Sequence, residues 1–160
     1  MLTARFLIER LDLEPLPVEG GYFRQTWLGQ RYHHAKAAGT AIYYLLTDEP
    51  GCFSALHRLP TDEVYHFYLG DPVQQLLLHP DGRTEIVVLG QDLAAGQRVQ
   101  HVAPRGTWQG SRLVPGGRVA LLGTTMAPGF DPTDYDPGIR ADLVAHYQGV
   151  ASLVHALTRE

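Results

Sequence analysis

Short apolar stretches alternate with polar positions along most of the chain, and turn residues separate one stretch from the next. Within residues 22–28, for example, Tyr22, Arg24 and Thr26 share one face of an extended segment, and Phe23, Gln25 and Trp27 share the other. Alternation of this kind, with a turn roughly every 8–12 residues, is typical of an all-β sandwich or barrel. We expect strands at 22–28, 41–47, 52–59, 63–69, 73–79, 84–89, 99–102 and 118–126.

Helical spacing occurs only toward the two ends of the sequence. Phe6, Leu7, Arg10 and Leu11 recur at helical intervals, which predicts a short amphipathic helix over residues 2–11. Residues 139–147 and 150–157 predict two further short helices. The pattern shows neither a repeat nor a linker, so we expect one domain over residues 1–160 in which a folded sheet hides its own edges.

Composition excludes several classes of function. The formal net charge is −4 and no run of Lys or Arg occurs, which argues against a nucleic-acid partner. The longest apolar runs are too short to cross a bilayer, and residues 1–5 do not begin a signal peptide, so we expect no membrane association. Cys52 is the only cysteine and cannot form an intramolecular disulfide, which favours a cytoplasmic location.

Two blocks of chemistry-bearing residues lie far apart in the sequence. The first contains His57, Leu59, Glu63 and Gly70, and the second runs from Pro104 through Gly106 to Gln109. Their spacing resembles the two motifs of the cupin superfamily, in which histidines would occupy positions 59 and 109.

The likeness is greatest to the uncharacterised DUF985-type (cupin 5) branch, through residues 19–26, 54–70 and 102–113. It implies a cupin double-stranded β-helix, or jelly-roll barrel, with short N- and C-terminal helices, a pocket at one end and a homodimer. It implies no particular reaction.

Strand alternation places the candidate catalytic residues on one side of the sheet. If Glu63 points into the barrel, then Tyr65, Phe67 and Leu69 do too, and His57 on the preceding strand can meet Glu63 in an aromatic-walled cavity. Such a cavity is typical of a small-molecule site. His57, Glu63 and Tyr65 are therefore our catalytic candidates, since a His and a Glu can exchange a proton at neutral pH. Alternatively, His57 and Glu63 only form interior hydrogen bonds.

A second set of residues would bind the ligand. Facing inward, Arg24 would bind a carboxylate or phosphate through its forked donors, whereas facing outward it would form a surface ion pair. We expect Tyr22 and Tyr44 at the mouth of the pocket, Phe67 in its aromatic wall and Trp108 as its lid, although aromatic residues in strands often only fill a core. The complete set of ligand-binding candidates is Tyr22, Arg24, Tyr44, Phe67, Trp108 and Gln109.

The same residues bear on a metal. His57 and Glu63 supply two ligands, whereas a catalytic zinc commonly has three, and the amide of Gln109 is a weak third. Tyr65 or Gln75 could complete a site. We therefore predict no tightly bound cofactor and at most a weak divalent metal held by His57, Glu63 and Gln109.

Three functions follow from these residues. The first is an isomerase or epimerase that acts on a carbohydrate-like or carbonyl-bearing ligand through His–Glu–Tyr acid–base chemistry. The second is a non-catalytic protein that binds a similar small molecule. A metal-dependent oxygenase of the kind found among cupins is the third, and Leu59 and Gln109 weaken it.

Overall fold

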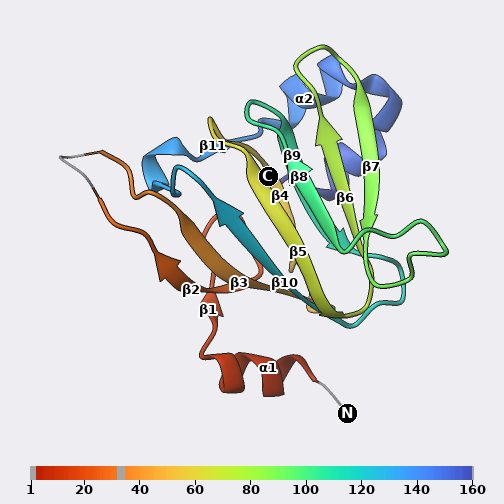
Figure 1. The fold of residues 1–160 in the computed structure, drawn as a ribbon. Helices are drawn as coiled ribbons and strands as arrows, with labels where there is room; N and C mark the ends of the chain where they lie inside the picture. Colours follow the sequence, from red (N-terminus) through yellow and green to blue (C-terminus); the bar gives the residue numbers. More distant parts are fainter. Residues whose placement is uncertain (1–2, 32–34, 160) are drawn as a thin grey trace.

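Two antiparallel β-sheets face each other in the computed structural model, which describes residues 3–31 and 35–159 (Figure 1). The six-stranded sheet has the order β1 (Glu14–Pro15), β2 (Tyr22–Leu28), β3 (Thr40–Thr47), β10 (Val119–Met126), β5 (Glu63–Gly70) and β8 (Gln100–Ala103). The five-stranded sheet has the order β11 (Asp136–Pro137), β4 (Ser54–Arg58), β9 (Trp108–Leu113), β6 (Val73–Leu78) and β7 (Thr84–Leu89).

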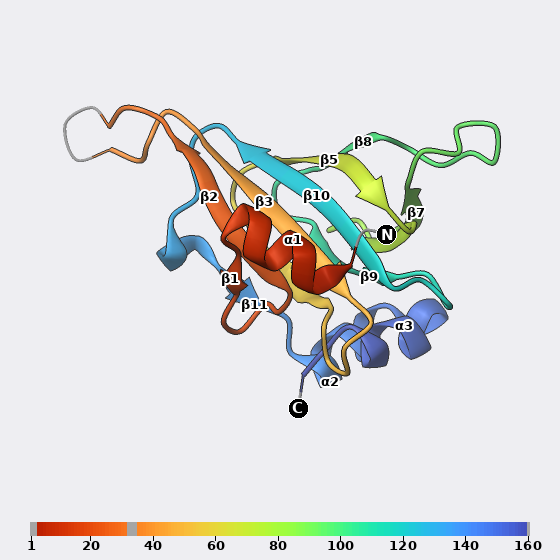
Figure 2. The ribbon, with the colours of Figure 1, turned by 90° about the horizontal axis from the view of Figure 1, so that it is seen from below.

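Short helices cover the outer faces of both sheets. Helix α1 (Ala4–Leu11), capped by the Thr3 side chain, packs on the six-stranded sheet, as Figure 2 shows from below. Helices α2 (Arg140–His146) and α3 (Ala151–Ala156) pack on the five-stranded sheet. Two 3₁₀ turns, η1 (Pro132–Asp134) and η2 (Gln148–Val150), complete the helical segments.

The all-β jelly-roll prediction with terminal helices is confirmed. Residue 2, where the predicted first helix begins, lies outside the described residues. Within the described part of the chain, every helix is too short or too polar to cross a bilayer.

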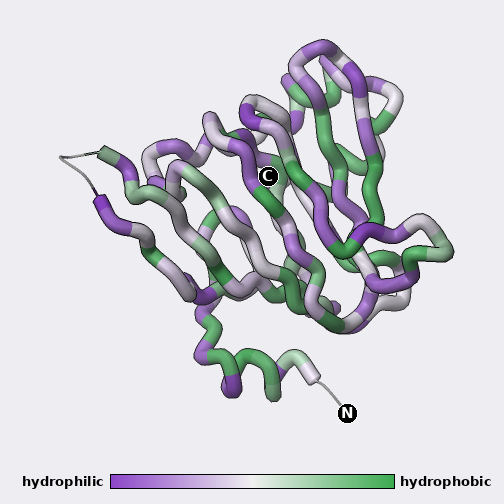
Figure 3. Tube along the Cα trace, viewed as in Figure 1, coloured by the Kyte–Doolittle hydropathy of each residue, from purple (hydrophilic) through white to green (hydrophobic). Residues whose placement is uncertain are grey.

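The main apolar core lies between the two sheets. Leu46, Val73, Leu77 and Leu89 are completely buried there, and Leu122 nearly so. Green and purple segments alternate along the strands in Figure 3, because one face of each strand is turned toward this core and the other away from it.

One central strand was missing from our prediction. Residues 108–113 form β9 between β4 and β6, although Gln109, Gly110 and Ser111 do not resemble a buried strand. Gly110 is required by close packing, since a Cβ there would lie 3.0 Å from Cγ of Leu56 and 3.0 Å from the Ser54 carbonyl oxygen. Gln109 and Ser111 are buried although they are polar, so the sequence of this strand shows no apolar pattern.

The prediction for Leu69 was wrong. A bulge in β5 pairs Phe67 with Leu122 and Leu69 with Leu121, so that Tyr68 is an additional residue on that strand. Leu69 therefore packs in the outer cluster beneath α1, whereas Glu63, Tyr65 and Phe67 keep the inward face that alternation predicts.

Candidate functional site

A cavity of about 90 Å³ opens between the sheets at the end of the barrel where β4 ends and β5 begins. Its apolar and aromatic wall consists of Leu16, Phe23, Ile42, Tyr44, Leu59, Tyr65, Met126 and Phe130. Its remaining lining residues are Glu19, Gln25, Thr40, His57, Glu63 and Thr124. Among the described residues, no Lys or Arg lines this cavity.

A buried hydrogen-bond network joins four predicted site residues. Nε2 of Gln109 donates to Oε2 of Glu63 at 2.7 Å and lies 3.4 Å from Nε2 of His57. The Tyr65 hydroxyl donates to the same Glu63 oxygen at 3.3 Å. All four residues are buried. Both sheets contribute to this network: β4 and β9 of the five-stranded sheet pair His57 directly with Gln109, and β5 of the facing sheet carries Glu63 and Tyr65.

The second nitrogen of His57 determines which tautomer the ring adopts. Nδ1 lies 2.8 Å from the Ala55 carbonyl oxygen, which can only accept, so Nδ1 carries the hydrogen. In the neutral ring, Nε2 is then an acceptor, and it faces the amide hydrogens of Gln109. Tyr135 stacks on the imidazole at a centroid distance of 4.9 Å and fixes its plane. The ring of His57 is thus held in one orientation beside the cavity, with Nε2 as its acceptor nitrogen.

The two tyrosines of the wall remain protonated. Burial raises the pKa of Tyr65 well above its ordinary value, and the neighbouring Glu63 adds to this effect. Burial likewise raises the pKa of Tyr44, whose hydroxyl donates to the Gly20 carbonyl oxygen at 2.8 Å. These phenols can therefore donate hydrogen bonds at neutral pH but do not act as bases.

Glu19 is a site residue that our sequence reasoning missed. It lies in the loop between β1 and β2, where Gly20 and Gly21 adopt positive φ angles of 101° and 75°. Its Oε1 accepts a hydrogen bond from the Ser54 hydroxyl at 2.7 Å, and its side chain lines the cavity. Burial raises the pKa of Glu19, and this effect exceeds the opposing influence of His57. The acid before the two glycines was the only available signal.

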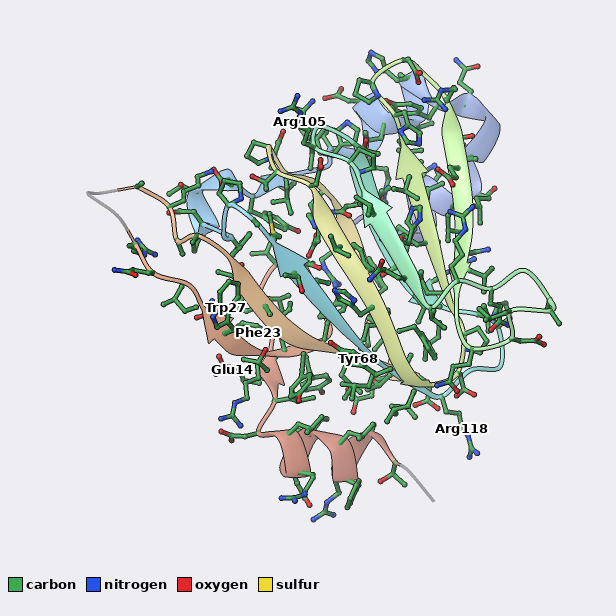
Figure 4. The ribbon with its side chains drawn as sticks, viewed as in Figure 1. Glu14, Phe23, Trp27, Tyr68, Arg105 and Arg118 are labelled. Carbon is green, nitrogen blue, oxygen red and sulfur yellow. The ribbon has the colours of Figure 1, made fainter. Side chains whose placement is uncertain are left out.

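Strand β2 turns the face with Phe23 and Gln25 toward the cavity, whereas our ligand-binding candidates Tyr22 and Arg24 lie on its outer face. Phe23 pairs with Tyr44 on β3, so both side chains lie on the inner face, and Phe23 and Gln25 line the cavity. Tyr22 instead donates a hydrogen bond from its hydroxyl to Glu49 on the outside. Figure 4 labels Phe23 and Trp27 on this strand.

Arg24 also lies on the outer face and does not enter the cavity. Its guanidinium donates to the Leu11 carbonyl oxygen at 3.1 Å and lies 3.7 Å from a carboxylate oxygen of Asp12. Arg24 therefore forms the surface ion pair that was the alternative prediction, and it cannot bind an anionic group of a ligand inside the cavity.

The two remaining aromatic candidates lie elsewhere. Trp108 packs in the cluster beneath α2 and α3 and lies under the guanidinium of Arg58 at 4.5 Å. Phe67 is buried among the core residues between the sheets. Neither lines the cavity, because Trp108 is on the outer face of β9 and Phe67 lies farther along β5 than Tyr65.

Comparison with known families identifies this architecture. The family described as "Cupin superfamily (DUF985)", Cupin_5, matches residues 5–137. The chain belongs to this family. The predicted resemblance is therefore confirmed, and it covers every strand of the two facing sheets.

The names of three similar proteins state no activity. Protein SO0799 from Shewanella oneidensis is 32% identical, with a TM-score of 0.90 and coverage of 99% of both chains. A hypothetical protein from Leishmania major is 30% identical, with a TM-score of 0.88 over 99% of this chain and 100% of that one. The uncharacterized protein YML079W from Saccharomyces cerevisiae is 29% identical in an alignment 136 residues long that covers 73% of this chain and 66% of the yeast protein.

Oxalate decarboxylase from Bacillus subtilis, a protein with Mn(II) centres, shares the fold at 14% identity. Its TM-score is 0.56 over 92% of this chain and 38% of that one.

The residues of this chain do not fit such a metal ion. The amide nitrogen of Gln109 contacts both Glu63 and His57, and an amide N–H donates hydrogen bonds but has no free electron pair for a cation. Leu59 adds an apolar side chain to the same cavity. Within residues 3–31 and 35–159, no three His, Cys, Asp or Glu side chains cluster as ligands.

Proposed function

We propose that this protein binds a short, uncharged hydroxycarbonyl compound in the barrel and moves a proton next to its carbonyl group, as an isomerase or epimerase does. The observation that carries the proposal is the buried His57–Gln109–Glu63–Tyr65 network beside an enclosed, mostly apolar cavity. Because Nδ1 of His57 donates to Ala55, Nε2 is the acceptor nitrogen of the ring, and a substrate proton would replace the 3.4 Å contact of Nε2 with the Gln109 amide, as a general base requires.

The proposed step uses two groups that arrive from different elements. Nε2 of His57 would take the proton from the carbon beside the carbonyl group, while the protonated Glu19 carboxyl gives its proton to the carbonyl oxygen. The products are an enediol, an imidazolium and the Glu19 carboxylate. The imidazolium then gives its proton to the former carbonyl carbon, and the carboxylate takes the proton of the hydroxyl group on the first carbon, which completes an isomerisation. Burial of Glu19, which raises its pKa, supports its role as the acid.

Size and charge of the cavity restrict the substrate. A cavity of about 90 Å³ is smaller than the roughly 300–1,000 Å³ of typical ligand pockets, so it suits a short carbon chain. The lining contains two carboxyl groups and no Lys or Arg among the described residues, which disfavours phosphate or carboxylate groups on the ligand. Dihydroxyacetone and glyceraldehyde meet these conditions, since both are short, uncharged and carry a hydroxyl group next to a carbonyl group.

Proton transfer can be tested directly by NMR in D₂O. The wild-type protein is expected to catalyse deuterium incorporation into dihydroxyacetone, and to do so faster than into dihydroxyacetone phosphate. His57→Gln is expected to lose this exchange. Saturable binding of dihydroxyacetone with no exchange would instead identify the alternative, a non-catalytic binding protein. A preference for the phosphorylated compound would contradict the charge argument.

Three expectations from the sequence stay predictions, namely the homodimer, the cytoplasmic location and a weakly held divalent metal. The metal-dependent oxygenase is disfavoured further, since the Gln109 amide lies against both side chains that would have to hold the ion.

A further inference from the structure

Arg159 ties the end of the chain to the loop that carries Glu19. Nε of Arg159 donates to the Val18 carbonyl oxygen at 3.0 Å, and Nη2 donates to the carbonyl oxygens of Glu19 at 3.0 Å and Phe53 at 3.1 Å. Both terminal nitrogens also approach the Gly51 carbonyl oxygen at 3.3 Å. One guanidinium thus joins four backbone carbonyl groups from two segments that flank the cavity.

The remaining contacts make this arrangement compact. The guanidinium carbon lies 4.2 Å from the centroid of the Phe53 ring. A Cβ at Gly20 would lie 2.1 Å from Nη2 of Arg159 and 2.4 Å from the Phe53 carbonyl oxygen, so the guanidinium packs directly on the Gly20 backbone. A larger residue at position 20 would displace it.

The loop that Arg159 holds has an unfavourable backbone conformation. Val18 has a φ of 69°, a region that a β-branched residue rarely adopts, and Gly20 follows with a φ of 101°. Such a conformation persists only where surrounding contacts determine it. The Glu19 carbonyl oxygen also accepts from the backbone N–H of Ala55, so the loop is attached to β4 at the same residue that Arg159 contacts.

We propose that Arg159 is a positioning residue, which fixes the backbone on both sides of Glu19 so that the Glu19 carboxyl lies in the cavity against Ser54. The consequence for proton donation rests on the function proposed above, whereas the positioning itself does not. Arg159 reaches Glu19 through backbone carbonyl groups, since each of these hydrogen bonds ends on a main-chain oxygen and not on the Glu19 carboxyl group.

Two possible effects of Arg159 on Glu19 have opposite signs. As a nearby positive charge, Arg159 lowers the pKa of Glu19, so removal of that charge alone would raise it further. As a positioning residue, Arg159 keeps the carboxyl away from water, so its removal would lower the pKa toward the ordinary value. The groups that act on Glu19 from the surrounding elements are Ser54 and His57 of β4, Glu63 and Tyr65 of β5, Tyr44 of β3, and Tyr135.

The experiment is a ¹³C NMR titration of the glutamate side-chain carboxyl groups in the full chain, with Glu19 assigned by Glu19→Gln. We expect Arg159→Ala to lower the Glu19 pKa by about one unit or more. Arg159→Lys keeps the charge but cannot join four carbonyl groups, and it is expected to lower the same pKa. Arg105→Ala, at an exposed position in the turn before β9, is the matched control and should leave it unchanged.

An unchanged or raised Glu19 pKa in Arg159→Ala would overturn the proposal and leave Arg159 as a neighbouring charge only. If Arg159→Ala does not fold, Arg159→Lys decides in the same way. The titration requires no substrate, so its failure does not affect the deuterium exchange test. Conversely, a lowered pKa together with absent exchange would reject the proposed function and retain the positioning role.

Discussion

Glu63 and Glu19 line the same cavity but are held there in different ways. Glu63 is the first residue of β5, is paired with strands on both sides, and accepts hydrogen bonds from Gln109 and Tyr65. Glu19 lies in a loop with positive φ angles and accepts a hydrogen bond from Ser54. The β-sheet therefore fixes the first acid, whereas contacts with distant parts of the sequence fix the second.

This difference separates a rigid half of the site from an adjustable half. The strand pairs His57–Gln109 and Glu63–Ala103 cannot shift without disrupting a sheet. The Glu19 loop can change its position when contacts such as those of Arg159 change. The position of the His57 side chain should therefore be insensitive to distant substitutions, whereas the position of the Glu19 carboxyl group should depend on them.

The largest expected effect is on the rigid half. We expect His57→Gln to lower the rate of deuterium incorporation into dihydroxyacetone by about 10²–10⁴-fold, because the general base is lost. Arg24→Ala, on the outer face of β2, is the control and should exchange at the wild-type rate. Equal losses in both variants, measured by ¹H NMR, would contradict the assignment.

The next effect concerns the amide of Gln109. The double variant Leu59→His, Gln109→His would place two further imidazoles beside His57 and Glu63 and would remove the amide N–H that contacts both. We expect its affinity for Mn²⁺ or Zn²⁺ to increase on the order of 100-fold or more, as measured by isothermal titration calorimetry. Equal affinities in the variant and the wild type would show that the amide does not prevent metal binding.

The raised pKa of Glu19, in the adjustable half, predicts that the stability of the protein depends on pH. Because the pKa of Glu19 is raised in the folded state, the folded protein binds more protons than the unfolded chain between the two pKa values. The free energy of unfolding of the wild type should therefore decrease, relative to Glu19→Gln, as pH increases through this range. Urea unfolding at a series of pH values measures this difference.

Ser54→Ala gives a matched comparison for that experiment. The Ser54 hydrogen bond lowers the Glu19 pKa, so its loss should extend the pH range over which stability decreases. A difference between wild type and Glu19→Gln that is constant with pH would contradict the raised pKa.

The smallest expected effects come from two phenol groups near the network. The Tyr135 hydroxyl is buried and has no hydrogen-bond partner among the described residues, whereas the Tyr65 hydroxyl donates to Glu63. Tyr135→Phe keeps the ring on His57 and is expected to increase the free energy of unfolding by up to about 1 kcal/mol. Tyr65→Phe should decrease it by about 0.5–1.5 kcal/mol. Denaturant unfolding that gives both variants the same sign would contradict this contrast.

Strand alternation predicted the orientation of three side chains in the rigid half. It placed Glu63, Tyr65 and His57 on inner faces, and all three line the cavity. It could not determine which face of β2 is turned inward, because both faces carry aromatic residues. Pairing of Phe23 with Tyr44 decides this, and pairing is not visible in one sequence.

The adjustable half depends on contacts that no local pattern contains. Glu19 and Arg159 are 140 residues apart, and each resembles an exposed charged residue in the sequence. The strand that carries Gln109 was also missed, since its polar residues are buried in the site and the glycine between them is needed for packing. A strand whose buried residues are polar thus lacks the alternating hydrophobic pattern by which it could be predicted from the sequence.

Deuterium incorporation into dihydroxyacetone, measured before and after exhaustive treatment with a chelator, tests the central claim most directly. The account predicts an exchange rate that is unchanged by the chelator, unchanged by added Mn²⁺ or Zn²⁺, and lost in His57→Gln. Exchange that disappears with the chelator and returns with a divalent metal would contradict it.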